Sequence, residues 1–359
     1  MTGCTGLVGS FLLDRLLRDS EARILCPVRA RDDEHARRRV LSALDRQQLR
    51  PRYPSDRLEC FAADLASPLL GMTREQFVRL SVRADLILHA GADTDCLRPY
   101  PSLVLANVEA TSELIRLARP RRIPLHFLST ISVIAGLGAA GVRMVSEGTP
   151  LAHAGRLGTD FARSKWVAER LLRNAGADGL PITIYRVDGV AGTVCDAGSA
   201  VDSLARTMIG SGLTPDIDVT LDVVSAGYLA AAISYLIASR PARRETYHLT
   251  AAQPTSLKKL CQILTEAEYD LLEVPHSTWY GQLVGADEAR ETSPFTAIPA
   301  ADRHRAAGLV HESRNSEVFP AFSRATALCA LADSGLACPP SEQLLRARFP
   351  AALTKERVR

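Results

Sequence analysis

The chain opens with MTGCTGLVGSFLLDRLL, residues 1–17, where Gly3, Gly6 and Gly9 precede apolar residues at helical spacing. Glycines at these places let backbone amides approach a pyrophosphate, and the N-terminus of the following helix adds partial positive charge. The stretch therefore predicts a dinucleotide site if strands and helices alternate after it. An ordinary glycine turn is the alternative, because three glycines alone are weak evidence.

Strands and helices do alternate through the first half of the chain. The predicted strands are short, apolar and bounded by polar or turn residues, as buried strands of a parallel sheet are. They span residues 22–30, 57–65, 84–92, 123–133 and 180–190, and helical spacing recurs in 11–17, 106–118 and 164–175. The alternation predicts an α/β fold with a doubly wound parallel sheet of Rossmann type, forming a dinucleotide-binding domain over residues 1–190.

The strand that normally precedes such a glycine motif is missing, because Met1 leaves no residues to form it. That strand is central in doubly wound sheets, so its absence should expose sheet edges and lower stability. The sequence predicts either a natural start further upstream or a damaged fold. An upstream apolar stretch of about five residues would restore the strand.

The pattern loosens in the second half of the chain, where glycine, serine and proline become more frequent. Segments near 218–250 are expected to return to the sheet, with strand-like runs at 218–224 and 246–250 and a helix between them. After Gln253 the pattern predicts helices joined by loops. Residues 191–359 are thus expected to form a smaller, mostly helical, substrate-binding lobe.

Composition excludes several classes of protein. Hydrophobic residues make up 47% of the chain, yet no apolar run approaches the roughly 18 to 20 residues that a membrane helix needs. We therefore expect a cytoplasmic protein that binds no membrane, and a net charge of +3 is too small to predict nucleic-acid binding. The eight cysteines include no C-x-x-C pair, which predicts buried free thiols without a metal site or a disulfide framework.

Charged residues after two predicted strands indicate which dinucleotide is bound. The first strand ends with Arg29 and Arg31, where an adenosine 2′-phosphate would lie, and the next ends with Asp64, placed to contact adenine. With the glycine motif, these residues predict NADPH rather than NADH. The nearby run HARRR (35–39) is interpreted as a solvated helix face for Arg37 to Arg39.

Two further motifs place polar residues beside each other. LSTISV (128–133) carries Thr130 at the end of a predicted strand, and GTDFARSKW (158–166) carries Phe161 and Lys165. Side chains four residues apart on a helix share a face, so a tyrosine at the first of these helix positions would place its hydroxyl beside the ammonium. Phe161 keeps the ring and lacks that hydroxyl.

Taken together, these motifs resemble the extended short-chain dehydrogenases, and among them the thioester reductase domains that terminate nonribosomal peptide synthetases and carboxylic acid reductases. The resemblance covers nearly the whole chain. It includes ADLASPLLGMT (63–73), HAGADTDCLRPYPS (89–102), SKWVAERLL (164–172), GLPITIYRVDGVAG (179–192) and TYHLTAAQPTSLKKL (246–260).

The resemblance implies an NADPH-dependent reductase that converts an acyl thioester to an aldehyde or alcohol. The implied partner is an acyl or peptidyl carrier protein that holds the thioester on its phosphopantetheine. Thr130 would hydrogen-bond the carbonyl oxygen, Lys165 would hold the nicotinamide ribose, and Asn107 would steady the lysine end of the site. The implied cofactor contacts are Thr2, Gly3, Thr5, Gly6, Leu7, Gly9, Arg29, Arg31, Asp64, Leu65, Gly91, Ala92 and Lys165.

Phe161 departs from the family pattern, in which a tyrosine supplies the proton; a positioned general acid contributes about 10²- to 10⁴-fold to rate. Val187 also replaces a usual proline, and VVSAG (223–227) lacks the usual Pro-Val-Asp, so we expect a remodelled substrate wall. Three functions stay open: an impaired or altered reductase, non-redox thioester release by condensation or cyclisation, and a cofactor-binding pseudoenzyme. The intact glycines and Arg29 favour retained NADPH binding, whereas the missing strand favours the pseudoenzyme.

Overall fold

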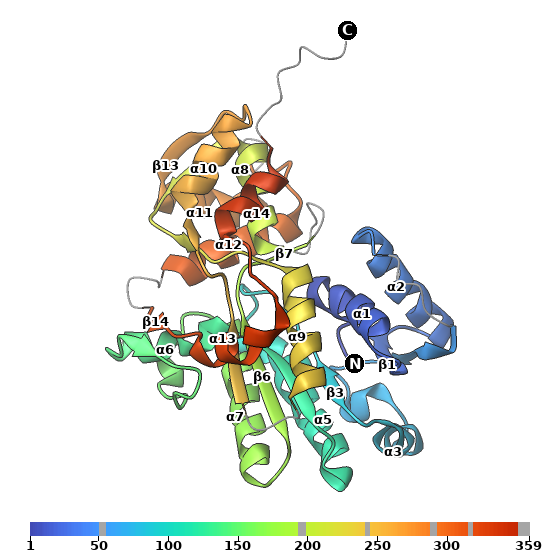
Figure 1. The fold of residues 1–359 in the computed structure, drawn as a ribbon. Helices are drawn as coiled ribbons and strands as arrows, with labels where there is room; N and C mark the ends of the chain where they lie inside the picture. Colours follow the sequence, from blue (N-terminus) through green and yellow to red (C-terminus); the bar gives the residue numbers. More distant parts are fainter. Residues whose placement is uncertain (50–54, 193–198, 241–244, 288–292, 315–318, 351–359) are drawn as a thin grey trace.

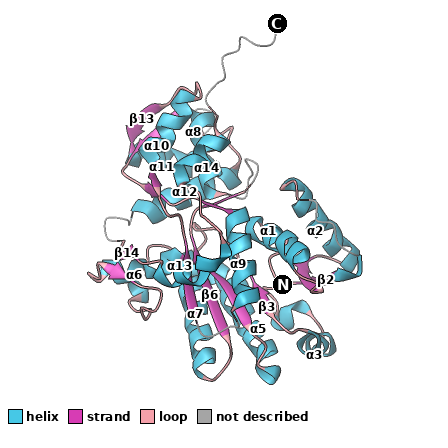
Figure 2. Cartoon of the chain, in the orientation of Figure 1, coloured by secondary structure: helices cyan, strands magenta, loops and turns pink. Residues whose placement is uncertain are grey.

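The computed structural model describes residues 1–49, 55–192, 199–240, 245–287, 293–314 and 319–350 (Figure 1). An α/β body carries the parallel strands, and a smaller, mostly helical lobe lies above it in this view (Figures 1 and 2). The predicted Rossmann-type architecture is therefore confirmed.

The body contains the predicted alternation of elements. Its strands are β1 (Ile24–Arg29), β2 (Leu58–Ala63), β3 (Ile87–His89), β4 (Leu125–Thr130), β6 (Ile182–Val187) and β11 (Glu245–Leu249). Its helices are α1 (Leu7–Asp19), α2 (Asp33–Arg46), α3 (Arg74–Arg83), α4 (Tyr100–Val104), α5 (Ala110–Ala118), α7 (Asp160–Ala177), α9 (Ala226–Ser239) and α13 (Ala325–Leu331).

The lobe and the connecting segments hold the remaining elements. They are α6 (Ala135–Ala139), β5 (Met144–Val145), β7 (Val190–Ala191), α8 (Ala200–Ser211), β8 (Leu213–Asp216), β9 (Thr220–Leu221), β10 (Val224–Ser225), β12 (Thr255–Ser256), α10 (Leu257–Glu266), β13 (Leu272–Pro275), α11 (His276–Val284), α12 (Ala300–Arg314), β14 (Ala321–Phe322) and α14 (Ser341–Arg348).

The parallel strands of the α/β body form two sheets that lie on either side of the chain start. One sheet has the order β11-β6-β4-β3, and the other pairs β1 with β2. Met1 and Thr2 lie between them: the terminal ammonium donates to the carbonyl oxygen of Leu25 at 2.7 Å, and the Thr2 amide donates to that of Leu88 at 3.0 Å. These two residues stand where the central strand was expected, so the β1–β2 pair is not continuous with the larger sheet.

A buried histidine fastens this two-residue bridge to the body. His89 Nδ1 lies 2.7 Å from the Thr2 hydroxyl, which also accepts the Gly91 amide at 3.1 Å. On its other side His89 Nε2 lies 3.3 Å from the Thr111 hydroxyl. His89 is only 1% exposed, so it is a core histidine, as is His126.

Helices cover both faces of the larger sheet, as the alternation of β4 and β6 side chains requires. Phe127 and Ile184 point to the layer of α3, α5 and α7, whereas Tyr185 and Val187 point to the layer of α1, α9 and α13. Strands buried on both faces read as apolar runs without alternation, which is why they were recognisable in the sequence.

The lobe has its own apolar core, built from α8, α10, α11, α12 and α14. Trp279 lies at its centre, fully buried and edge-on to Phe295 with ring centroids 5.8 Å apart. Helix α13 instead packs on β11 and α9 in the body, although it follows the lobe in sequence (Figure 1). The division of the chain at residue 190 stays a prediction.

Only one of the two strands expected near 218–250 joins the larger sheet. Strand β11 pairs with β6, as predicted for residues 246–250. The run 218–224 instead splits into β9, which pairs with β12, and β10, which pairs with β7. The split falls at Asp222, whose carboxylate accepts the Ala251 amide at 2.7 Å and so draws the chain away from an extended strand.

Thiols and membrane segments can be assessed for the part of the chain that the structure describes. Seven cysteines are free there, and Cys195 lies outside the described residues. No described helix combines the length and apolar character needed to cross a membrane. The described residues also contain no group of three or more His, Cys, Asp or Glu side chains arranged to hold a metal ion.

Candidate active site

A cavity of about 720 Å³ lies at the carboxyl ends of the parallel strands, beside the glycine motif. Ligands of doubly wound folds bind at this edge. Of the predicted site residues, those that line the cavity are Gly3, Thr5, Gly6, Leu7, Gly9, Arg29, Asp64, Leu65, Gly91, Ala92, Thr130, Phe161 and Lys165. Thr2, Arg31 and Asn107 are not among the lining residues, for reasons given below.

Two glycines of the motif are required by the fold itself. A Cβ on Gly3, whose φ is +78°, would lie 2.5 Å from the backbone of Ala90 and Gly91. A Cβ on Gly9 would lie 1.9 Å from the Gly3 carbonyl oxygen. These glycines let helix α1 approach the end of β3, and they would be needed with or without a ligand.

Gly6 is under a weaker structural constraint than Gly3 and Gly9, and this makes it informative. It is exposed, its φ of −84° suits any residue, and a Cβ there would meet only the Gly3 carbonyl oxygen, at 3.3 Å. Gly6 is also the N-cap of α1, with no side-chain cap and no acidic residue in the first turn. A glycine under so weak a constraint, at a helix N-terminus open to a cavity, fits a closely approaching phosphate.

The cavity is cationic beside the end of β1, where Arg29 and Arg39 line it. Arg29 lines the cavity at the end of β1, as expected. Arg39, interpreted above as part of a solvated helix face, also lines it and donates to the carbonyl oxygen of Arg29. Arg31 is exposed outside the cavity and pairs with Asp32 at 3.2 Å, because Asp32 caps helix α2 and holds the guanidinium there.

Thr2 does not line the cavity because its hydroxyl is engaged in the fold. It is 2% exposed and is held between His89 and the Gly91 amide. Asp64 does line the cavity, where its carboxylate accepts the Ala66 amide at 3.1 Å and the Ser67 hydroxyl at 3.3 Å. Thr2 therefore orients the glycine loop from behind, and Asp64 orders the loop after β2.

At the opposite end of the cavity, Thr130, Phe161 and Lys165 come together. Thr130 ends strand β4, and helix α7 carries Phe161 and Lys165 one turn apart. Helix α7 starts there because Thr159 caps it, its hydroxyl accepting the Ala162 amide at 3.1 Å. Phe161 thus lines the same cavity as Thr130 and Lys165.

Lys165 is a buried ammonium group with few partners. Its Nζ donates to the carbonyl oxygen of Leu128 at 2.6 Å and lies 3.9 Å from the centre of the Phe127 ring. Burial lowers the pKa of Lys165 to about 7, despite the attraction of Glu169 one turn further along the helix. A group poised near neutral pH inside a cavity is typical of active sites.

Glu169 belongs to a charged network beneath the site. It receives the Ser129 hydroxyl at 2.6 Å and two nitrogens of Arg186 at 3.0 and 2.8 Å, and the side chains of Glu169 and Arg186 are fully buried. Burial raises the pKa of Glu169, but attraction to Arg186 and hydrogen bonds from Arg186 and Ser129 outweigh it, so the carboxyl stays ionised. The network joins α7 to β4 and β6 next to Lys165 and Thr130.

Asn107 supports the site at one remove, through Ser164. Its side chain exchanges hydrogen bonds with the Asp93 backbone at 2.8 and 2.9 Å and donates to the Ser164 hydroxyl at 2.9 Å. Ser164 in turn donates to the Phe161 carbonyl oxygen at 2.7 Å. Asn107 lies in a π-helical turn, Leu105–Glu109, a form frequent at functional sites, and it fixes the start of α7 against the loop after β3.

The two smaller departures from the family pattern have simple local explanations. In VVSAG (223–227), which lacks the Pro-Val-Asp of the family, the Ser225 hydroxyl caps α9 by accepting the Tyr228 amide at 3.0 Å. Serine and aspartate serve about equally well as N-caps. Val187 ends β6 in regular pairing with Thr130 and Leu249 and lines the cavity. The predicted remodelling of the wall is thus limited to the Val187 side chain and its surroundings.

The lobe supplies a cavity wall for which the sequence held no signal. Ala200 of α8 and Arg305 and Leu309 of α12 line the cavity opposite the strands. The loop after β3 meets α12 closely: a Cβ on Gly308 would lie 2.8 Å from the Cβ of Cys96. No periodic pattern links positions so far apart in the chain.

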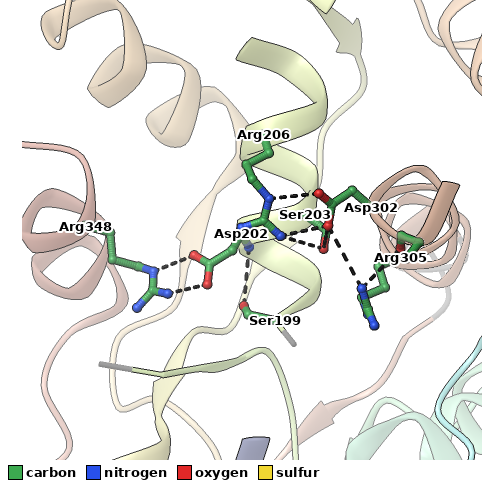
Figure 3. Close-up of polar contacts among 8 residues, drawn as sticks. Ser199, Asp202, Ser203, Arg206, Asp302, Arg305 and Arg348 are labelled. Atoms are coloured by element: carbon green, nitrogen blue, oxygen red, sulfur yellow. Dashed lines mark hydrogen bonds and ion pairs between the residues drawn. The ribbon is translucent and has the colours of Figure 1, made fainter. Parts of the chain in front are cut away.

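Ion pairs hold these lobe helices in place (Figure 3). Arg206 of α8 binds both carboxylate oxygens of Asp302 on α12 at 2.9 and 2.7 Å, and Arg305 lies 4.0 Å from the same carboxylate. On the other side of α8, Asp202 pairs with Arg348 of α14, almost fully buried. Breaking such a buried pair typically costs about 3–5 kcal/mol, so the packing of α8 against α14 is strongly held.

Comparison with known proteins identifies the family. The family described as Male sterility protein, an NAD-binding domain, matches residues 1–233. The terminal R domain from the myxalamid PKS-NRPS biosynthetic pathway superposes with a TM-score of 0.82 at 30% identity, over 97% of this chain and 88% of that one. The chain belongs to the thioester reductase domain family.

Curated relatives of this reductase domain are much longer proteins. Isonitrile lipopeptide synthase of Streptomyces coeruleorubidus is 33% identical over 297 residues, which is 80% of this chain and 20% of that protein. A linear gramicidin synthase of Brevibacillus parabrevis is 30% identical over 349 residues, 96% of this chain and 7% of that protein. The domain therefore spans a fifth or less of each, and family membership makes it an oxidoreductase-type enzyme that uses a nicotinamide cofactor.

Proposed function

We propose that the chain reduces a carrier-bound acyl thioester with NADPH, releasing an aldehyde, or an alcohol after a second reduction. The observation that supports this most directly is that Thr130, Phe161 and Lys165 line the same cavity as the glycine loop. A bound carbonyl and a bound nucleotide would therefore share one enclosed space. The Phe161 substitution alters the proton supply and leaves the architecture of that space intact.

The residues present fit a dinucleotide with a 2′-phosphate. The Gly6 end of α1 would hold the pyrophosphate, Arg29 and Arg39 would hold the 2′-phosphate, and Lys165 would bind the nicotinamide ribose. When bound, NADPH supplies hydride. The Thr130 hydroxyl would orient the thioester carbonyl toward it, and the apolar ring of Phe161 would help to keep water from the reacting carbon.

The partner we propose is an acyl or peptidyl carrier protein with its phosphopantetheine arm. The named relatives are peptide and lipopeptide synthases, and a solved archaeal thiolation-reductase di-domain has the same fold, with a TM-score of 0.73 at 18% identity. A flexible arm would enter between the loop after β3 and the lobe. Arg98 and Arg305 line the cavity there.

A second candidate is non-redox release of the thioester by condensation or cyclisation, and Phe161 is the observation that favours it. A condensing enzyme does not need a nucleotide, whereas this chain retains an exposed Gly6 and two arginines at the adenosine end. Retention of these residues favours the reductase.

The direct test is an assay of NADPH oxidation with acyl-pantetheine thioesters as substrates. The loss of NADPH absorbance measures the reaction, and product analysis identifies what is released. Stoichiometric NADPH loss and aldehyde would support the reductase. Thioester loss without NADPH oxidation would favour the condensing enzyme. If this chain and its Phe161→Tyr variant both bind the nucleotide but neither oxidises NADPH nor consumes the thioester, the protein is a cofactor-binding pseudoenzyme.

Arg29→Ala should weaken NADPH binding by about tenfold to 100-fold, the loss expected for one hydrogen bond to a charged group. NADH affinity should change little, because NADH lacks the 2′-phosphate. The measurement is calorimetric titration with both nucleotides. Arg31→Ala is the matched control, since Arg31 lies outside the cavity. An unchanged NADPH preference in Arg29→Ala would place the 2′-phosphate elsewhere.

Gly6→Ala should weaken binding of either nucleotide by about tenfold or more, because its methyl group would occupy the space that a phosphate needs. The thermal unfolding midpoint should shift by a few degrees at most, since the φ of Gly6 suits alanine. Gly155→Ala is a suitable control, being an exposed glycine without neighbours and outside the cavity. Full nucleotide affinity in Gly6→Ala would contradict a pyrophosphate at this helix end.

A further inference from the structure

We propose that Lys165 itself donates the proton to the substrate oxygen, a role that goes beyond holding the ribose. The inference rests on the proposed reductase function and concerns how this chain works without the tyrosine. Phe161 precedes Lys165 by one helical turn and lines the same cavity, so removing the hydroxyl leaves the ammonium as the next group along that face.

The hydroxyl groups at this end each have one hydrogen to donate and do not ionise near neutral pH, so they can orient a carbonyl oxygen but cannot protonate it. Thr130 donates to the Ser132 hydroxyl at 3.1 Å, a bond that a carbonyl at Thr130 would replace, and Ser129 donates to Glu169 at 2.6 Å. An ammonium has three N–H groups. Lys165 gives one to the Leu128 carbonyl oxygen, and its cationic head also sits over the Phe127 ring. At this end of the cavity, Lys165 is therefore the described side chain best able to release a proton.

The position of Leu128 places the ammonium within reach of a carbonyl at Thr130. Leu128 and Thr130 are two residues apart on β4, which separates them by about 7 Å along the strand. Lys165 Nζ lies 2.6 Å from the Leu128 carbonyl oxygen, and Thr130 lines the same cavity. A carbonyl oxygen bound at Thr130 would therefore lie on the same stretch of β4 that the ammonium already contacts.

The charges around Lys165 suit a proton donor. Glu169 faces it from the same helix, and Arg186 on β6 compensates that carboxylate. His89 on β3 is close enough for the ammonium to oppose its protonation, and His89 is neutral at pH 7. Burial of Lys165 therefore outweighs the attraction of Glu169 and lowers the pKa of Lys165 to about 7, where a general acid is effective at neutral pH.

The step balances without another reagent. The thioester carbonyl carbon gains hydride from the reduced nicotinamide, and the electron pair of the C=O π bond moves to oxygen. One N–H bond of Lys165 breaks as the new O–H bond forms, giving a thiohemiacetal and a neutral amine. The amine regains its proton from solvent. Loss of the O–H proton then reforms the carbonyl, and the pantetheine sulfur leaves and takes up a proton.

Single-turnover rates at several pH values, with acyl-pantetheine as substrate, test the proposal. The rate of the unaltered chain should fall as pH rises above about 7, because the ammonium is lost. Lys165→Arg keeps a cation but cannot release a proton in this range. It should lower the rate at pH 6 by about 10²-fold, while the NADPH dissociation constant changes by less than about tenfold.

The same substitution in a Phe161→Tyr background separates proton donation from positioning. There Lys165→Arg should lower the rate by less than about tenfold, because the tyrosine supplies the proton. An equal loss in both backgrounds, or a rate of the unaltered chain that is flat from pH 6 to 9, would overturn the proposal. So would activity confined to Phe161→Tyr. Absence of NADPH oxidation in every variant would instead refute the proposed function.

Discussion

Phe161→Tyr is expected to oxidise NADPH with an acyl-pantetheine thioester about 10²-fold faster than the unaltered chain at pH 9. The Phe161 ring lines the cavity with Thr130 and Lys165, so an added hydroxyl enters that space and can donate a proton. At pH 6 the gain should shrink to about tenfold, because protonated Lys165 already serves as the donor there. Stopped-flow measurement of NADPH absorbance at both pH values gives the comparison.

Phe161→Leu is the matched control, since it changes the ring without adding a donor. It should show no gain at either pH. Phe161→Tyr could also show no gain in rate while NADPH and the thioester still bind. The introduced tyrosine hydroxyl would then not face the substrate carbonyl, and the comparison with tyrosine-containing relatives would be wrong at this residue.

Local patterns were enough to predict the body of the fold. The strands that become β1 to β4 and β6 are buried on both faces, and such strands leave uninterrupted apolar runs. The glycine motif was equally legible, because Gly3 and Gly9 are required by close backbone approach and Gly6 remains open. These features depend on neighbours within a few turns or on the period of one element.

Features that depend on distant parts of the chain were predicted poorly. Arg31 was expected at the cofactor and Arg39 on a solvated helix face, whereas Arg39 lines the cavity and Arg31 is paired with Asp32 outside it. The wall formed by Arg305 and Leu309 depends on how α12 packs across the loop after β3. A sequence pattern carries no record of such packing.

Burial is the other quantity that the sequence did not supply. Lys165 was recognised from its spacing to Phe161, but its nearly neutral pKa comes from three-dimensional enclosure. Asn107 was expected at the lysine end of the site, and there it donates to Ser164, the residue before Lys165; its second partner, the Asp93 backbone, was not predictable from the sequence.

Lowering the pH from 7 to 5 should reduce the free energy of unfolding by about 5 kcal/mol. Burial lowers the pKa of His89 to about 3 and those of His126 and His248 to about 4; at His248 the Arg186 charge adds to the effect. At pH values between the ordinary histidine pKa of 6.5 and these lowered values, the unfolded chain binds protons that the folded chain does not. The free energy of unfolding therefore decreases as the pH is lowered.

At pH 5 each of these histidines should lower the free energy of unfolding by about 2 kcal/mol. This pH lies about 1.5 units below the ordinary histidine pKa, and each unit contributes about 1.36 kcal/mol. Asp222 should offset about 1 kcal/mol of this loss. Burial raises its pKa to about 6, so as the pH is lowered the folded chain takes up this proton at a higher pH than the unfolded chain does. The net loss is a large fraction of the 5–15 kcal/mol typical of a folded domain. Urea unfolding at pH 5, 6 and 7, followed by circular dichroism, measures it.

His126→Gln isolates one contribution. It should remove about 2 kcal/mol of the change between pH 7 and 5, even though losing the 2.8 Å contact of His126 with the Tyr185 hydroxyl lowers stability at every pH. His153→Asn should leave the pH dependence unaltered, since His153 is exposed and asparagine tolerates its left-handed backbone. A stability that stays level down to pH 5 would mean that these histidines reach solvent protons while folded. In that case the hydrogen bonds between His89 and the hydroxyls of Thr2 and Thr111, which fasten the glycine loop to the body, are not maintained.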